Sequence, residues 1–280
     1  MLAKLLAVVV IISLTFSSGL QVEREQLLAV LKNVPLLVRA LVANFVIVPI
    51  LGVLLVKAFH LAPMVATGFL LMAIAPGVPF VLVRTRQKGG SLELAVALAV
   101  VLPLLSIVTV PLTAALVLPA ASQAQLPLAR FAMTLVLFQL LPLLIGIIIG
   151  TRLPQVAERL TRPILLIFWI SVTVLLIALL PRVVREIASI YGSLGILASF
   201  CLVILSFATG WALGGPARED RRVLAIGTTL RNIGLCALIA TTNFPQSDVV
   251  AAVMTYLLVQ AIVVAIASVL FTRTAHSAVA

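Results

Sequence analysis

Long apolar stretches, each about the length of a membrane-spanning helix, follow one another along almost the whole chain. A helix needs about 20 mostly apolar residues to cross a bilayer, within a range of ~17–25. Apolar residues occupy all sides of these stretches instead of alternating, which argues against a β-barrel. We therefore expect an all-α polytopic membrane protein in which 1–280 form a single transmembrane domain. Cutting at polar, proline and glycine positions predicts nine spans: 1–20, 34–58, 61–88, 91–118, 127–150, 162–181, 190–214, 221–242 and 247–271.

The first predicted span has an alternative interpretation, because Lys4 precedes an apolar run as in a signal peptide. The run Leu5–Phe16 ends in Ser17-Ser18-Gly19-Leu20, without a clear small-x-small cleavage pattern. We therefore expect a retained span.

Composition excludes most soluble classes. Of 280 residues, 63% are hydrophobic and 10% charged, with a mean hydropathy of +1.31, which leaves too little polar surface to cover a soluble core. The net charge of +11 does not indicate a nucleic-acid partner, because no basic face with interleaved aromatics occurs. The two cysteines, Cys201 and Cys236, lie within apolar spans and are interpreted as packing residues, with no disulfide framework or metal site.

The basic residues are distributed unequally between the two sides of the predicted bundle. Thirteen fall in loops on one side and five on the other, while Arg231 lies inside a span. Because basic loops stay in the cytoplasm, nine spans place the C-terminus there and the N-terminus outside. We expect a multi-pass protein of the plasma membrane, in a bacterium the inner membrane.

Arg231 is the most costly residue to place in lipid. It follows Arg221 by ten residues, about 15 Å along a helix, which puts it near the bilayer midplane. A central arginine costs on the order of 2.5–3.5 kcal/mol on insertion scales, so it faces a cavity or a partner. The eight acidic residues all lie in loops or at span ends. Two interpretations stay open: an anion site or built-in cation, and an arginine satisfied by backbone carbonyls.

The segment 75–80 should interrupt the third predicted span. Pro76 and Pro79 cannot donate backbone hydrogen bonds, and Gly77 adds conformational freedom. Lipid cannot satisfy the freed backbone groups, so the break must be buried or line a wet cavity. Phe80 would then begin a second half-helix.

A matching interruption is predicted in the second half of the chain, at 227–235. It contains two glycines, Thr228, Thr229, Arg231 and Asn232 in an otherwise apolar span. Interrupted helices at corresponding positions of two halves indicate the binding site of a transporter. Asn44 is a further polar residue at membrane depth, and an interhelical hydrogen bond explains it as well as a ligand role does.

These residues together resemble the bile acid:sodium symporter family. The resemblance depends on the Pro-Gly break, the Asn-x-Gly-Leu of 232–235, and the Asn-Phe…Pro formed by Asn44, Phe45 and Pro49, in the family's order along nearly the whole chain. It implies a ten-helix inverted repeat whose first helix this chain lacks, with two broken helices crossing at mid-membrane. It also implies a core domain (34–118 and 190–271) that slides against a panel domain (1–20, 127–150 and 162–181).

The chain departs from the family at the positions that the resemblance assigns to sodium. Where the family has a glutamate and a glutamine, this sequence has Gly227 and Arg231. Val81 and Leu82 replace a serine-asparagine pair, and two further polar ligands correspond to alanines, at 95 and 99. Sodium needs several oxygen ligands, so we expect no sodium, no other metal and no cofactor.

We expect a secondary transporter of a small organic anion that works by alternating access. The predicted substrate site consists of Arg231, Asn232, Thr228, Thr229, Pro76, Gly77, Pro79, Phe80 and Asn44. A sodium-independent uniporter or exporter and a proton-linked carrier are alternatives within transport. An intramembrane enzyme would need convergent His, Asp, Glu or Cys residues, and a non-transporting scaffold would be indicated by a long soluble extension. Substrate identity and oligomeric state are left open.

Overall fold

A computed structural model describes residues 2–22, 34–76, 91–123, 126–192, 194–244 and 248–276, with the side chains of 121, 182–192 and 267–276 excepted. Within these ranges every regular element is a helix, which confirms the all-α prediction. Eight described helices are long and apolar enough to cross a membrane, and a shorter apolar helix, Pro63–Ile74, begins the predicted span 61–88. The protein is therefore a polytopic helical membrane protein.

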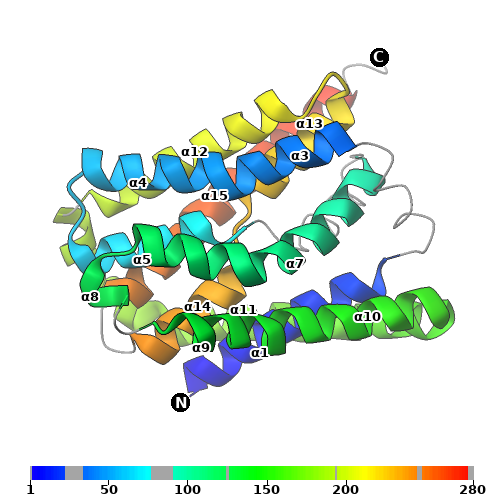
Figure 1. Ribbon diagram of the computed structural model, residues 1–280, viewed down its shortest axis with the longest axis horizontal. Helices are drawn as coiled ribbons and strands as arrows, with labels where there is room; N and C mark the ends of the chain where they lie inside the picture. The colour runs from blue at the N-terminus through cyan, green and yellow to red at the C-terminus, as the bar shows by residue number, and fades with distance from the viewer. Residues whose placement is uncertain are drawn as a thin grey trace.

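The helices run mostly along the long axis of the molecule (Figure 1). Helix α1 begins at the lower left of the view, and α15 ends toward its upper right. In chain order the elements are α1 (Leu2–Leu20), α3 (Val34–Val42), η2 (Ala43–Ile47), α4 (Val48–Ala58), α5 (Pro63–Ile74), α7 (Leu92–Val117), α8 (Ala120–Gln123), α9 (Leu128–Leu135), η3 (Val136–Leu140), α10 (Leu141–Arg152), α11 (Pro154–Gly192), α12 (Gly195–Leu213), α13 (Arg218–Thr229), α14 (Ile233–Asn243) and α15 (Asp248–His276).

The predicted bounds of one span were wrong. The sequence predicts a span over 162–181, whereas α11 begins at Pro154 and continues to Gly192. Proline suits the first turn of a helix, where its missing N–H has no partner to lose. Arg159 is exposed, so α11 carries it at no burial cost. The predicted span 221–242 corresponds to α13 and α14, which are separated at the interruption predicted within 227–235.

The helices pack in two groups, seen on opposite sides of Figure 1. Helix α1 packs along α10 and α11, while α5 packs on α15 and α12 packs on α4, α13 and α15. The two groups meet where α1 contacts α14 and η3 contacts α7. This grouping parallels the predicted panel and core, whose division into moving bodies stays a prediction.

Glycines bring the backbones of α1 and α10 into direct contact. A Cβ atom on Gly19 would lie 2.4 Å from the carbonyl oxygen of Leu143, and one on Gly146 would lie 2.5 Å from that of Phe16. Small residues that allow such approach are the usual basis of helix association in lipid. The α1–α10 pair therefore depends on the absence of side chains at these positions.

Two helices contain a five-residue π-helical segment, η2 and η3. Each is followed by a proline at the second residue of the next helix, Pro49 in α4 and Pro142 in α10. Proline lacks an N–H and clashes with the carbonyl four residues earlier, and a widened turn relieves this clash. The segments carry Asn44 and Gln139, both buried.

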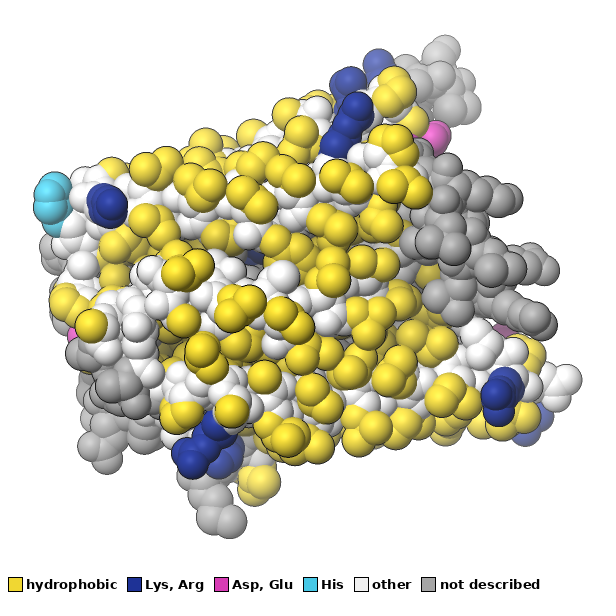
Figure 2. Space-filling view, in the orientation of Figure 1, with side chains coloured by type: hydrophobic (Ala, Val, Ile, Leu, Met, Phe, Trp, Pro, Cys, Tyr) yellow, Lys and Arg dark blue, Asp and Glu magenta, His cyan; other side chains and the backbone are white. Residues whose placement is uncertain are grey.

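The surface between the two ends of the molecule is almost entirely apolar, with basic side chains at the ends (Figure 2). Large apolar side chains such as Leu116, Ile177 and Leu166 are more than half exposed. Water would make this exposure costly, whereas lipid does not. The pattern fits a bundle whose sides face hydrocarbon.

Candidate functional site

The predicted interruption in the second half is present and separates α13 from α14. Helix α13 ends at Thr229, and Leu230 has an extended backbone with φ −73° and ψ 118°. Asn232 then caps α14, because its side-chain oxygen accepts a hydrogen bond from the Leu235 backbone N–H at 3.1 Å. The cap explains why the chain resumes a helix at Ile233.

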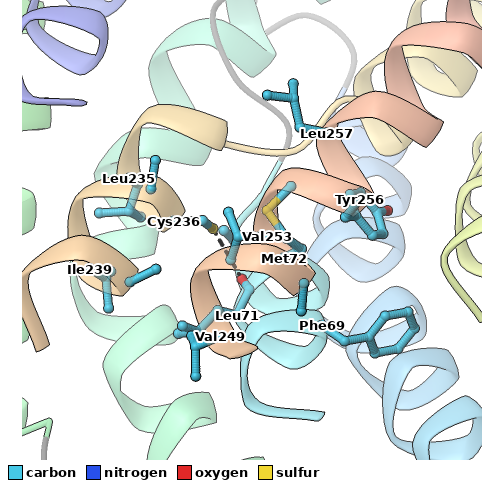
Figure 3. Close-up of a cluster of buried hydrophobic side chains, with 14 of the residues drawn as sticks. Phe69, Leu71, Met72, Leu235, Cys236, Ile239, Val249, Val253, Tyr256 and Leu257 are labelled. Carbon is cyan, nitrogen blue, oxygen red and sulfur yellow. Dashed lines mark hydrogen bonds between the residues drawn. The ribbon is translucent and has the colours of Figure 1, made fainter. Parts of the chain in front are cut away.

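The end of α5 meets this interruption. Ala75 is extended, and its carbonyl oxygen accepts a hydrogen bond from Nη1 of Arg231 at 3.4 Å. One turn earlier, the Leu71 carbonyl accepts from the Cys236 thiol at 3.4 Å, which Figure 3 shows as a dashed line. Arg231 therefore satisfies the Ala75 carbonyl at the end of α5, while the Cys236 thiol is a second donor to the Leu71 carbonyl, which also accepts the Ala75 backbone N–H. Of the predicted site residues on this side, Pro76 is buried, and Gly77, Pro79 and Phe80 lie outside the described residues.

Arg231 lies in the interruption between α13 and α14, next to the end of α5, and is only 3% exposed. Its backbone N–H donates to Oε1 of Gln260 at 2.8 Å, and Nη1 also donates to Oδ1 of Asn44 at 3.5 Å. Nε and Nη2 have no hydrogen-bond partner among the described residues. The hydroxyl of Tyr256 lies beside the guanidinium and interacts with it. These two nitrogens form one edge of the planar group, which can bind an anion with two parallel hydrogen bonds.

The remaining predicted site residues have local partners. The Thr228 and Thr229 hydroxyls donate to carbonyls of their own helix, those of Leu224 and Ala225, each at 2.7 Å. Because each hydroxyl proton is already donated, only the acceptor lone pairs remain for a ligand. Both residues are fully buried. Asn44 makes an interhelical hydrogen bond, one of its two predicted interpretations, with Arg231 as donor.

A second polar network joins the interruption to η3. The Nδ2 of Asn232 donates to Oε1 of Gln139, and Nε2 of Gln139 donates to the Ser106 hydroxyl at 2.7 Å and the Pro103 carbonyl at 3.2 Å. Gln139 is 1% exposed. One buried amide side chain in η3 therefore connects the α13–α14 interruption with α7.

An apolar cavity of about 230 Å³ borders the interruption. Its walls come from α1, α11, α14 and α15, and include Val10, Leu14, Phe168, Trp169, Arg231 and Gly234. It therefore lies where the α1–α11 group meets the broken helix. An anionic group held at Arg231 would have apolar walls next to it.

Comparison with known proteins places the chain in a family. The profile of the Sodium Bile acid symporter family matches residues 8–192. The chain belongs to this family. Its members are transporters, not enzymes, so the chain is a membrane protein of a transporter family. The P3 proteins of Bos taurus and Mus musculus are 26% identical to it over 147 and 151 residues, or 51% and 53% of this chain. Those stretches are 31% and 32% of the two relatives, so the match spans about a third of their length.

At the described positions that the resemblance assigns to sodium ligands, the side chains carry no oxygen. Gly227, Ala95 and Ala99 are buried, and Val81 and Leu82 lie outside the described residues. In the described part of the chain, no group of three His, Cys, Asp or Glu side chains could hold a metal. The cation next to the Ala75 carbonyl is Arg231 itself.

Sequence reasoning missed Gln139, Gln260 and Tyr256. The first two were detectable, because each is an amide inside an apolar span, and Gln139 precedes a proline as Asn44 does. No pattern indicated Tyr256, whose importance comes only from its place beside the guanidinium.

Proposed function

We propose that this family member is a secondary transporter of a small organic anion that has an apolar body. The observation that carries the proposal is Arg231, a buried cation that lines an apolar cavity and whose Nε and Nη2 have no hydrogen-bond acceptor within 3.5 Å among the described residues. A buried charge without a counter-charge is costly. An anionic substrate would supply that charge together with two hydrogen bonds.

The cavity supports the second half of the proposal, the apolar body. Phe168, Trp169 and Leu14 give it aromatic and aliphatic walls. Gly234, in the first turn of α14, also lines it, so the positive end of that helix dipole faces the same space. Both the charge and the dipole favour an anion over a cation.

The place of the cavity supports alternating access. It lies between α1 and α11 on one side and α14 and α15 on the other, which are the predicted panel and core. Sliding of the core along the panel would carry a bound anion from one membrane face to the other. We place this transporter in the plasma membrane, in a bacterium the inner membrane.

We infer that transport does not depend on sodium. Arg231 Nη1 binds the Ala75 carbonyl and the Asn44 side chain, two oxygens that a bound cation would otherwise use. A uniporter or exporter, or a proton-linked carrier, would fit this arrangement. An enzyme would need convergent acid, base or nucleophile groups, and in the described part of the chain no three His, Cys, Asp or Glu side chains gather at a potential metal site.

Replacing Arg231 tests the proposal. A hydrogen bond to a charged group contributes about 1.5–3 kcal/mol, so Arg231→Met should weaken anion binding about 10- to 150-fold. The anion affinity of Arg231→Lys should lie between those of the wild type and Arg231→Met, because lysine keeps the charge and loses the planar edge. Binding is measured by ligand-dependent thermal shift across carboxylates and sulfonates of increasing size.

The exposed Arg159 supplies the matched control, since Arg159→Met also removes one positive charge. It should leave anion affinity unchanged. If Arg231 only packs, its replacement by methionine removes a costly buried charge, and the protein should be as stable or more stable. A well-folded Arg231→Met protein that binds anions as the wild type does would refute the assignment.

A further inference from the structure

A second cavity, of about 180 Å³, lies near the N-terminal end of α1, between α1, α9 and α14. Its walls are apolar and aromatic, and include Phe131, Phe138 and Leu238. Lys4 and Arg130 also line it, and no acidic side chain does so among the described residues. The cavity therefore combines apolar walls with two positive charges.

Neither charge is neutralised within the described part of the chain. Lys4 and Arg130 are exposed and make no ion pair with any described acidic residue. The polar side chains of Thr134, Thr242 and Asn243 also border the cavity. Two cations, several hydrogen-bonding groups and apolar walls are complementary to an amphipathic anion.

The place of this cavity connects it to the site at Arg231. Both hollows lie along the contact between α1 and α14. Between them the two helices touch, since a Cβ on Gly234 would lie 3.0 Å from the Cβ of Ile11. Lys4 and Val8 lie on the outer side of this contact, and Val10 and Leu14 line the inner cavity.

We propose that the cavity at Lys4 and Arg130 is a first binding site for the transported anion, which holds it before the α1–α14 contact opens. This rests on the proposed function, and it adds a separate site that selects a free carboxylate or sulfonate with an apolar body. The two exposed cations supply the charge selection. The aromatic walls hold the apolar part.

The photoreactive carboxylate 4-benzoylbenzoate tests this with the full chain in phosphatidylcholine nanodiscs. Irradiation of bound 4-benzoylbenzoate should label the peptide that contains Phe131 and Phe138. The neutral amide of the same probe should label this peptide much less. Exposed charges of this kind each contribute a few-fold, so Lys4→Gln with Arg130→Gln should lower labelling affinity about 2- to 30-fold. Lys57→Gln removes an exposed lysine outside this cavity and should have no effect.

The outcome separates this site from the one at Arg231. Labelling near Phe131 should survive in Arg231→Met. If this variant loses transport, the site at Lys4 and Arg130 should still bind the probe. Equal labelling by the neutral amide would overturn the proposal, because the cavity would then be merely apolar. So would complete loss of labelling in phosphatidylglycerol nanodiscs, since the occupant would then be a lipid headgroup.

Discussion

Replacing Gln139 with leucine should weaken the contact between η3 and the interrupted helix. Leucine is similar in size, so the change removes hydrogen bonds and leaves little cavity. Ser106 keeps its own bond to the Pro103 carbonyl at 2.7 Å, so it stays satisfied. Asn232 loses the acceptor of its Nδ2 group, which has no other partner within the described residues. The expected loss is thus dominated by one buried, unpaired donor.

The magnitude lies between two estimates. An unsatisfied buried donor costs about 1–3 kcal/mol in soluble proteins, whereas interhelical hydrogen bonds in membrane proteins average about 0.6 kcal/mol with a maximum near 1.7. We therefore expect Gln139→Leu to lower the free energy of unfolding by about 1–2 kcal/mol. Thr109→Val removes an exposed hydroxyl bonded to its own helix and should have no measurable effect.

A double-mutant cycle isolates the pair. Asn232→Ser keeps an oxygen able to cap α14 but is too short to reach Gln139. The coupling between Gln139→Leu and Asn232→Ser, measured by unfolding in detergent, should be about 0.6–1.7 kcal/mol. Effects that add to within about 0.5 kcal/mol would refute the reasoning, because independent sites behave in that way.

Two further predictions follow from the packing and from the composition of the site. Gly146→Val should separate α1 from α10 and lower the melting temperature, since even a Cβ would lie 2.5 Å from the Phe16 carbonyl oxygen. Ile148→Val on the lipid-facing side serves as the control. Equal melting temperatures for the two variants would contradict the contact. Uptake of an organic anion into proteoliposomes should continue when potassium or choline replaces sodium, and a rate that collapses without sodium would show that oxygen ligands exist elsewhere.

Much of the fold could be predicted from the sequence, because the span pattern is local. The break before Asn232 and the burial of Arg231 follow from polar and glycine residues in an apolar run. The partners of Arg231 do not, since Asn44 and Ala75 lie 187 and 156 residues away. Which carbonyl or amide meets the guanidinium is decided by helix packing, and no periodicity encodes it.

The π-helical segments show a similar limit. Pro49 and Pro142 are visible in the sequence and predict a kink. Whether the helix bends or widens depends on what lies inside the bundle, and here the widened turns direct Asn44 and Gln139 to buried partners. Prolines next to buried amides are therefore a usable signal for polar contacts at membrane depth.

A fixed arginine changes which state of the transporter carries a net positive charge, the loaded state or the empty one. Sodium leaves with the substrate, whereas Arg231 keeps its charge after the anion has left. Under the proposed mechanism the loaded site is neutral, whereas the empty site carries an uncompensated positive charge past apolar walls. Moving that charge against the membrane potential costs up to about 2.3 kcal/mol per 100 mV for a full crossing. Return of the empty core should then be the slow step. We expect exchange against an internal anion to be faster than net uptake into empty proteoliposomes, and equal rates would mean that the arginine charge does not move with the core.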